Sequence, residues 1–237
     1  METLSERRFL VTGASGGVGG AVARRLAGCG ARVILTGRKR IRLQEIAAAL
    51  PGRAHQFFCA DLTIENEIQE LVRFAERERL DGIIHCAAII IPNDFVKASV
   101  EEFEAQFATN VRAPFRLTQL LLAALTSSQG QVIFINSSAG RHASAGVSQY
   151  AATKHALRAL ADSLREECNP AGIRVCSLFL GSTATAMQER VRVYQGRSYD
   201  PEQLIQPDDV ARMIAAILAV PQTAEVTDFA MRPTAKT

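Results

Sequence analysis

The sequence has few of the features that mark secreted, membrane or metal-binding proteins. Its five cysteines are scattered without a Cys-x-x-Cys pair, which predicts neither a disulfide framework nor a metal site and favours reduced thiols in a cytoplasmic protein. The longest apolar run, residues 83–91, contains a histidine and is far shorter than the roughly 20 residues of a membrane span. Because a turn is expected at Gly13 after only four apolar-rich residues, we expect no signal peptide.

The sequence also lacks a strong excess of either charge. Its 27 basic and 24 acidic residues leave a net charge of +3, which is too near balance for a dedicated nucleic-acid surface but leaves room for a small anionic ligand. Hydrophobic residues make up 48% of the 237 residues and charged residues 22%, which disfavours disorder. We therefore expect residues 1–237 to form one domain with no nucleic-acid or membrane partner.

Strand-like and helix-like segments alternate along the chain. Short buried strands are expected at residues 9–11, 32–36, 55–60, 83–84, 131–135, 175–179 and 225–231. Helices are expected at residues 21–26, 41–50, 64–79, 100–125, 150–167 and 207–218. This alternation predicts an α/β fold: a doubly wound, Rossmann-type domain with a mostly parallel seven-stranded sheet and helices on both faces.

A glycine cluster follows the first expected strand. Gly13, Gly17 and Gly19 form a TGxxxGxG spacing where that strand meets the first helix. Glycines allow a tight turn and a close approach of the backbone to a ligand, and the free N–H groups at a helix start attract anions. An isolated glycine trio is more often an ordinary turn, but its placement here predicts a pyrophosphate-binding site.

Two further patterns bear on catalysis. Tyr150 and Lys154 are four residues apart in an expected helix, so both side chains lie on one face. A nearby ammonium favours the phenolate and is expected to lower the pKa of the phenol. Such a pair alone is commonly a solvated pair, but Ser137 and Ser138 end the fifth strand, at the sheet edge where α/β proteins bind ligands.

The glycine spacing, the Asn136-Ser137-Ser138-Ala139-Gly140 segment and the YxxxK motif resemble the classical short-chain dehydrogenase/reductase family. The resemblance spans residues 12–185, in the order typical of the family. It implies that Tyr150 is the general acid/base and that Lys154 lowers its pKa and binds the nicotinamide ribose. It further implies that Ser138 orients the substrate carbonyl, with Ser137 as the alternative if the loop is shifted by one residue. Asn110 would sustain a proton relay.

The resemblance also implies a dinucleotide cofactor. Where family members that prefer NAD carry an acid, this sequence reads Thr36-Gly37-Arg38, so Arg38 is expected to bind the 2′-phosphate of NADP(H), although the alternative is a solvated basic helix start. Asp61 would contact the adenine or simply cap the next helix. The implied cofactor-binding residues are Gly13, Ser15, Gly17, Val18, Gly19, Arg38, Asp61, Leu62, Cys86, Ala87, Ala88, Tyr150, Lys154, Gly181, Thr183 and Thr185.

Two segments depart from the family pattern. The family's NNAG reads His85-Cys86-Ala87-Ala88 here, and the loss of both asparagines is expected to loosen the neighbouring turns. We interpret His85 as a buried structural histidine. The family's PG reads Leu180-Gly181, which keeps the glycine.

These patterns predict an NADP(H)-dependent oxidoreductase acting on a small-molecule carbonyl or secondary alcohol. Residues 186–206 would form the substrate lid. The alternatives are a non-catalytic NADP(H)-binding sensor or scaffold and, less in keeping with the short segment after residue 185, an isomerase or epimerase. Apolar positions on helices 113–125 and 156–164 favour a homotetramer or a homodimer.

Overall fold

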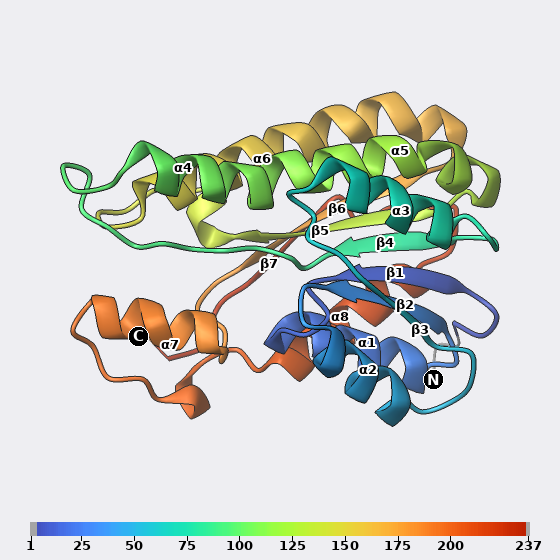
Figure 1. Ribbon diagram of the computed structural model, residues 1–237, viewed down its shortest axis with the longest axis horizontal. Helices are drawn as coiled ribbons and strands as arrows, with labels where there is room; N and C mark the ends of the chain where they lie inside the picture. Colours follow the sequence, from blue (N-terminus) through green and yellow to red (C-terminus); the bar gives the residue numbers. More distant parts are fainter. Residues whose placement is uncertain (1–3, 236–237) are drawn as a thin grey trace.

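The apolar runs form one parallel sheet, in keeping with the near-continuous hydrophobic strands of a sheet covered on both faces. The computed structural model describes residues 4–235 and orders their strands β3-β2-β1-β4-β5-β6-β7, each pair parallel (Figure 1). The strands are β1 (Arg8–Thr12), β2 (Arg32–Gly37), β3 (Gln56–Cys59), β4 (Gly82–His85), β5 (Gln131–Ser137), β6 (Arg174–Leu180) and β7 (Asp228–Met231). The predicted α/β class is confirmed.

Helices cover both faces of the sheet. One layer contains α1 (Gly17–Gly28), α2 (Arg40–Ala49) and α8 (Pro207–Ala219), and the other contains α3 (Glu65–Ala75), α5 (Ala113–Ser128) and α6 (Ser148–Cys168). Each layer buries an apolar stripe against the strands, giving two hydrophobic cores on opposite sides of the sheet. Among the helices of residues 4–235, none is both long enough and apolar enough to cross a membrane.

The strand order reverses beside β1. The chain builds outward from β1 through β2 to β3, then returns to place β4 on the other side of β1. Loops that leave the carboxyl ends of β1 and β4 therefore run in opposite directions and open a crevice, which is where doubly wound sheets bind ligands. The predicted glycine turn and the segment after β4 both lie at this point.

The helix expected at residues 100–125 is interrupted. The structure has α4 (Val100–Phe107), a π-helical turn η1 (Ala108–Arg112) and then α5. Within η1, the buried Asn110 side chain accepts a hydrogen bond from the Ile89 N–H and donates one to the Ile89 carbonyl, both at 2.8 Å. The π-turn thus places an amide where it clamps the segment that follows β4.

A short helix lies outside both layers. Helix α7 (Ala186–Tyr194), drawn in orange in Figure 1, occupies the predicted lid region together with a 3₁₀ turn at Pro201–Gln203. A parallel bridge between Thr183 and Ile205 joins the two ends of this excursion. The lid is therefore anchored at its base to the end of β6.

Candidate active site

A cleft of 720 Å³ opens at the carboxyl ends of the strands. Its lining includes every residue expected to contact the cofactor, together with both serines that end β5. Asn110 does not line it, because its buried side chain lies behind the cleft wall. The structure thus brings together residues that are spread over most of the chain.

The glycine turn leaves no room for side chains. Gly13 has a φ of +62°, and a Cβ atom there would lie 2.8 Å from the backbone of Ala87. A Cβ atom on Gly19 would collide with the carbonyl oxygen of Gly13, and one on Gly17 would lie 2.9 Å from the Thr185 side chain. Helix α1 consequently begins tightly against β1, with its backbone open to the cleft.

The segment after β4 is well supported without the two asparagines. The Thr12 hydroxyl oxygen accepts hydrogen bonds from the N–H groups of Cys86 and Ala87, at 3.0 and 3.1 Å. A threonine at the end of β1 therefore ties the two loops together. This role was missed because Thr12 attracts attention in the sequence only as the start of the glycine motif.

His85 has the environment of a structural residue. It is 4% exposed, its Nε2 lies 2.8 Å from the Thr118 hydroxyl, and its ring stacks on Phe134 with centroids 5.0 Å apart. Burial, with a contribution from the Lys154 charge, lowers the pKa of His85 to about 3. The ring is therefore neutral at physiological pH and packs as part of the core.

Tyr150 and Lys154 share one face of α6, as the spacing predicts. The Lys154 Nζ donates a hydrogen bond to the Ile135 carbonyl at 2.9 Å and lies 5.7 Å from the centroid of the Tyr150 ring. Burial lowers the pKa of Lys154 to about 8 and raises that of Tyr150 to about 12. The expected lowering of the Tyr150 pKa is therefore wrong, because desolvation of the phenol dominates in this cleft.

Ser137, rather than Ser138, faces Tyr150. The Ser137 hydroxyl is within hydrogen-bonding distance of the phenol and also accepts a hydrogen bond from the Ala139 N–H at 3.1 Å. Ser138 begins the next turn and is exposed. Of the two serines, the contact with the phenol is made by the residue that ends β5. This contact favours the stated alternative, Ser137.

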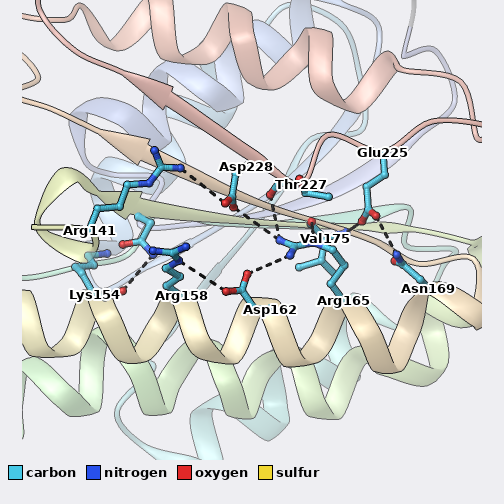
Figure 2. A network of polar contacts seen from close by, with 11 residues as sticks. Arg141, Lys154, Arg158, Asp162, Arg165, Asn169, Val175, Glu225, Thr227 and Asp228 are labelled. Carbon is cyan, nitrogen blue, oxygen red and sulfur yellow. Dashed lines mark hydrogen bonds and ion pairs between the residues drawn. The ribbon is translucent and has the colours of Figure 1, made fainter.

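Helix α6 is tied to the far edge of the sheet by a polar network (Figure 2). The Arg165 guanidinium donates to the Val175 carbonyl at 3.0 Å and forms an ion pair with Asp162 at 3.1 Å. Asp228 on β7 lies within ion-pair distance of Arg165 and of Arg141 in the loop after β5. These contacts fix the helix that carries Tyr150 and Lys154 relative to β6 and β7.

Basic residues lie at the end of the cleft formed by β2 and β3. Arg38 and Lys39 are exposed and line it. Asp61 accepts hydrogen bonds from both the backbone N–H and the hydroxyl of Thr63, a local turn that ends before α3. It does not cap this helix, whose N-cap residue is Ile64 and has no side-chain cap hydrogen bond. Burial raises the pKa of Asp61, but the Thr63 hydrogen bonds and the Arg38 charge outweigh it and lower the pKa.

Helix α7 runs from the glycine turn to the loop before Tyr150. At its start, Thr185 caps the helix by accepting from the Gln188 N–H and lies against the glycine turn at Gly17. At its other end, the Tyr194 hydroxyl donates to Asp94 at 3.1 Å, and its ring lies beside Gly146, four residues before Tyr150. The predicted lid is thus held by contacts at both ends of α7.

Comparisons with known proteins identify the family. A family model described as short chain dehydrogenase matches residues 7–195. The chain belongs to the short-chain dehydrogenase family. Similar structures include a short chain dehydrogenase from Escherichia coli CFT073 complexed with NADPH (32% identity, 97% of this chain and 98% of that one, TM-score 0.89). A second, from Shigella flexneri complexed with NADP, has 31% identity, the same coverage and a TM-score of 0.88.

One curated relative is named only as an oxidoreductase, without a substrate or a cofactor. An uncharacterized oxidoreductase of Staphylococcus aureus USA300 is 28% identical over 98% of this chain and 100% of its own length. Membership in the short-chain dehydrogenase family, together with this relative, places the chain among oxidoreductases.

Proposed function

We propose that this chain is an NADP(H)-dependent oxidoreductase that transfers a hydride between the nicotinamide and a carbonyl or secondary alcohol. The observation that carries the proposal is the convergence of Ser137, Tyr150 and Lys154 in the cleft that also contains the glycine turn and Arg38. A complete catalytic set of this kind favours an enzyme over a non-catalytic NADP(H)-binding sensor.

The residues present fit the cofactor. The glycine turn leaves backbone N–H groups free of overlying side chains, which suits a pyrophosphate, and Arg38 with Lys39 supplies positive charge for a 2′-phosphate. Two relatives at 31% and 32% identity were solved with NADP and NADPH, which supports the same choice here. When bound, the cofactor supplies the hydride.

The proton chemistry belongs to Tyr150. With its pKa raised to about 12, the phenol is protonated at neutral pH and is prepared to donate a proton to a carbonyl oxygen. Ser137 lies beside it as the donor that would polarise the same oxygen. Lys154, held by the Ile135 carbonyl, keeps a positive charge beside the phenol below its pKa of about 8, and this charge favours the phenolate left after proton transfer.

We assign Asn110 a positioning role. Its side-chain amide donates to Thr153 at 3.1 Å as well as to the Ile89 carbonyl, so its hydrogen-bonding capacity is used within the protein. Thr153 precedes Lys154 on α6, and Ile89 lines the cleft. Asn110 therefore couples the cleft wall to the helix that carries the catalytic pair.

Turnover of NADPH with a panel of aldehydes, ketones and diketones, followed by absorbance, tests the proposal. Tyr150→Phe keeps the ring but removes the proton donor, so kcat should fall by about 10²–10⁴-fold while the Kd for NADPH stays unchanged. Tyr199→Phe, in the loop after α7 but outside the lining of the cleft, is the matched control and should retain full turnover. Near-native turnover by the Tyr150 variant would overturn the assigned chemistry.

A further inference from the structure

One arginine of the lid is buried without a partner. Arg192 lies in the last turn of α7, is 8% exposed and lines the cleft. Within residues 4–235, its guanidinium makes no hydrogen bond or ion pair. None of its nitrogen atoms is sealed from solvent, so most of the side chain is buried while the guanidinium keeps contact with water at the cleft. A guanidinium placed in this way, with no protein partner, offers several donors to an anion. The missing partner of Arg192 is therefore expected to be a ligand.

The position of Arg192 along α7 indicates which part of a ligand it meets. Thr185, at the start of the helix, lies against the glycine turn, where the cofactor pyrophosphate is proposed to bind. Arg192 is seven residues further on, about 10 Å along the helix axis. It is two residues from Tyr194, whose ring lies beside Gly146 in the loop before Tyr150. Arg192 thus lies toward the catalytic end of the cleft.

Two further arginines of the lid segment, Arg190 and Arg197, line the cleft, and both are exposed. Asp94, which accepts from Tyr194, is outside the lining and forms an ion pair with Lys97. Among the described lining residues the one carboxylate is Asp61, which lies at the opposite end with Arg38 and is hydrogen-bonded to Thr63. The lid end therefore presents positive charge to whatever occupies it.

From this arrangement we propose that the substrate carries an oxyanion, a carboxylate being the simplest, in addition to its reacting carbonyl or hydroxyl group. The guanidinium of Arg192 binds the oxyanion through its planar pair of donors, while Tyr150 and Ser137 donate hydrogen bonds to the reacting oxygen. The substrate class is then an oxo acid or hydroxy acid rather than a neutral ketone or alcohol. This inference rests on the proposed oxidoreductase function and narrows it.

Matched pairs that differ only in charge test the proposal. NADPH turnover is measured with acetoacetate, 4-oxopentanoate and 5-oxohexanoate, each beside its methyl ester, so that the distance between carbonyl and carboxylate varies. For at least one length, kcat/KM should favour the acid by about ten-fold or more, the range expected for a charge-assisted hydrogen bond.

Variants assign that preference to Arg192. Arg192→Met should remove it by slowing the acid and leaving the ester unchanged, whereas Arg192→Lys should keep part of it. Arg212→Met, which removes the same charge from an exposed site on α8 outside the cleft, is the control and should keep the full preference.

Three other outcomes would overturn the inference, and they differ in what they leave standing. Equal kcat/KM for acids and esters in the unmodified protein would overturn it while the oxidoreductase function stands, and this comparison needs no variant to fold. A rise in the Kd for NADPH in Arg192→Met, with the acid preference unchanged, would assign the arginine to a cofactor phosphate. Absence of turnover with every compound would overturn the proposed function and this inference with it.

Discussion

Two adjacent serines lie where β5 ends: Ser137 is its last residue, and Ser138 begins the following 3₁₀ turn. Ser137 is within hydrogen-bonding distance of Tyr150, and Ser138 is exposed. Ser137→Ala should therefore lower kcat by about 10²–10³-fold, as expected for loss of a donor to the developing oxyanion. Ser138→Ala should change kcat by less than about three-fold and is the matched control. Steady-state kinetics on one carbonyl substrate measures both, and the reverse ranking would restore Ser138 as the catalytic serine.

His85 makes the stability of the protein depend on pH. Its pKa is about 3 in the folded protein against an ordinary value of 6.5, so between these values the unfolded chain binds a proton that the folded chain does not. Stability is fully present above pH 6.5 and falls as the pH drops toward 3, by at most about 1.4 kcal/mol per pH unit from this group.

Replacement of His85 removes this contribution. Because asparagine does not titrate, the His85→Asn variant should lose less stability than the unmodified protein on going from pH 7 to pH 5. The difference in the free energy of unfolding, variant minus unmodified protein, should therefore increase. Urea unfolding at both pH values measures the change. His142→Asn, at an exposed position, is the control. A difference that stays constant with pH would show that the folded protein can protonate His85.

The residues that sequence analysis located correctly in the cleft are those set by local geometry. Tyr150 and Lys154 share a face because a helix repeats every 3.6 residues, and Gly19 is crowded by the Gly13 carbonyl, six residues earlier in the chain. Arg192 was not distinguished from the other lid arginines, because its burial depends on how α7 packs over the rest of the molecule. The pKa of Tyr150 was misjudged for the same reason, since desolvation is a property of the assembled cleft.

At the scale of elements, the strands and most helices were predictable from apolar periodicity, but the break at η1 was not. The apolar pattern continues through residues 108–112, so periodicity alone predicts one helix. What stabilises the π-turn is the pair of hydrogen bonds between Asn110 and Ile89, 21 residues away in the chain. A contact that distant has no signature in a local pattern.

The end of β2 is the element that decides between cofactors. Arg38 is exposed at this end of the cleft, and a charge-assisted contact to the 2′-phosphate corresponds to roughly 10–150-fold in affinity. NADPH should therefore bind at least about ten-fold more tightly than NADH. Arg38→Ala should erase most of that ratio without changing the Kd for NADH. Nucleotide fluorescence titrations at fixed ionic strength measure both constants.

A substitution at Gly37, next to Arg38, should change the cofactor preference in favour of NADH. Gly37→Asp should reverse the preference, because a carboxylate attracts the ribose hydroxyl and repels the phosphate. The substitution is sterically feasible: its Cβ atom would lie 3.3 Å from the Ser15 hydroxyl, which can rotate. Arg40→Ala is the control, since Arg40 lies over the Phe57 ring and outside the cleft. Equal affinities for the two nucleotides in the unmodified protein would refute the NADP(H) proposal.

At the scale of the whole molecule, the described surface carries an aromatic patch on α4 and α5. Of the α5 residues expected at an assembly surface, Leu117, Leu121 and Leu125 are buried against the sheet, and Leu120 and Leu122 are half-buried. On α6, Leu157 and Ala161 are buried as well. The side chains of Phe103, Phe107 and Phe115 remain 37%, 42% and 48% exposed. Phe103 and Phe107 are four residues apart on α4, with ring centroids 6.2 Å apart, and Phe115 follows on α5. We propose that a second copy of the chain covers this patch.

Light scattering after gel filtration tests this assembly. A homodimer, or a homotetramer of two such dimers, should appear at micromolar concentration, because an isologous contact buries the three phenylalanines twice. Phe115→Glu places like charges on both sides of the interface and should shift the protein toward the monomer mass of 25.7 kDa without loss of helical circular dichroism. Ile41→Glu, at a position 75% exposed on α2, should leave the mass unchanged. A monomeric unmodified protein would contradict the proposal, and an assembly that both variants preserve would place the interface on another face.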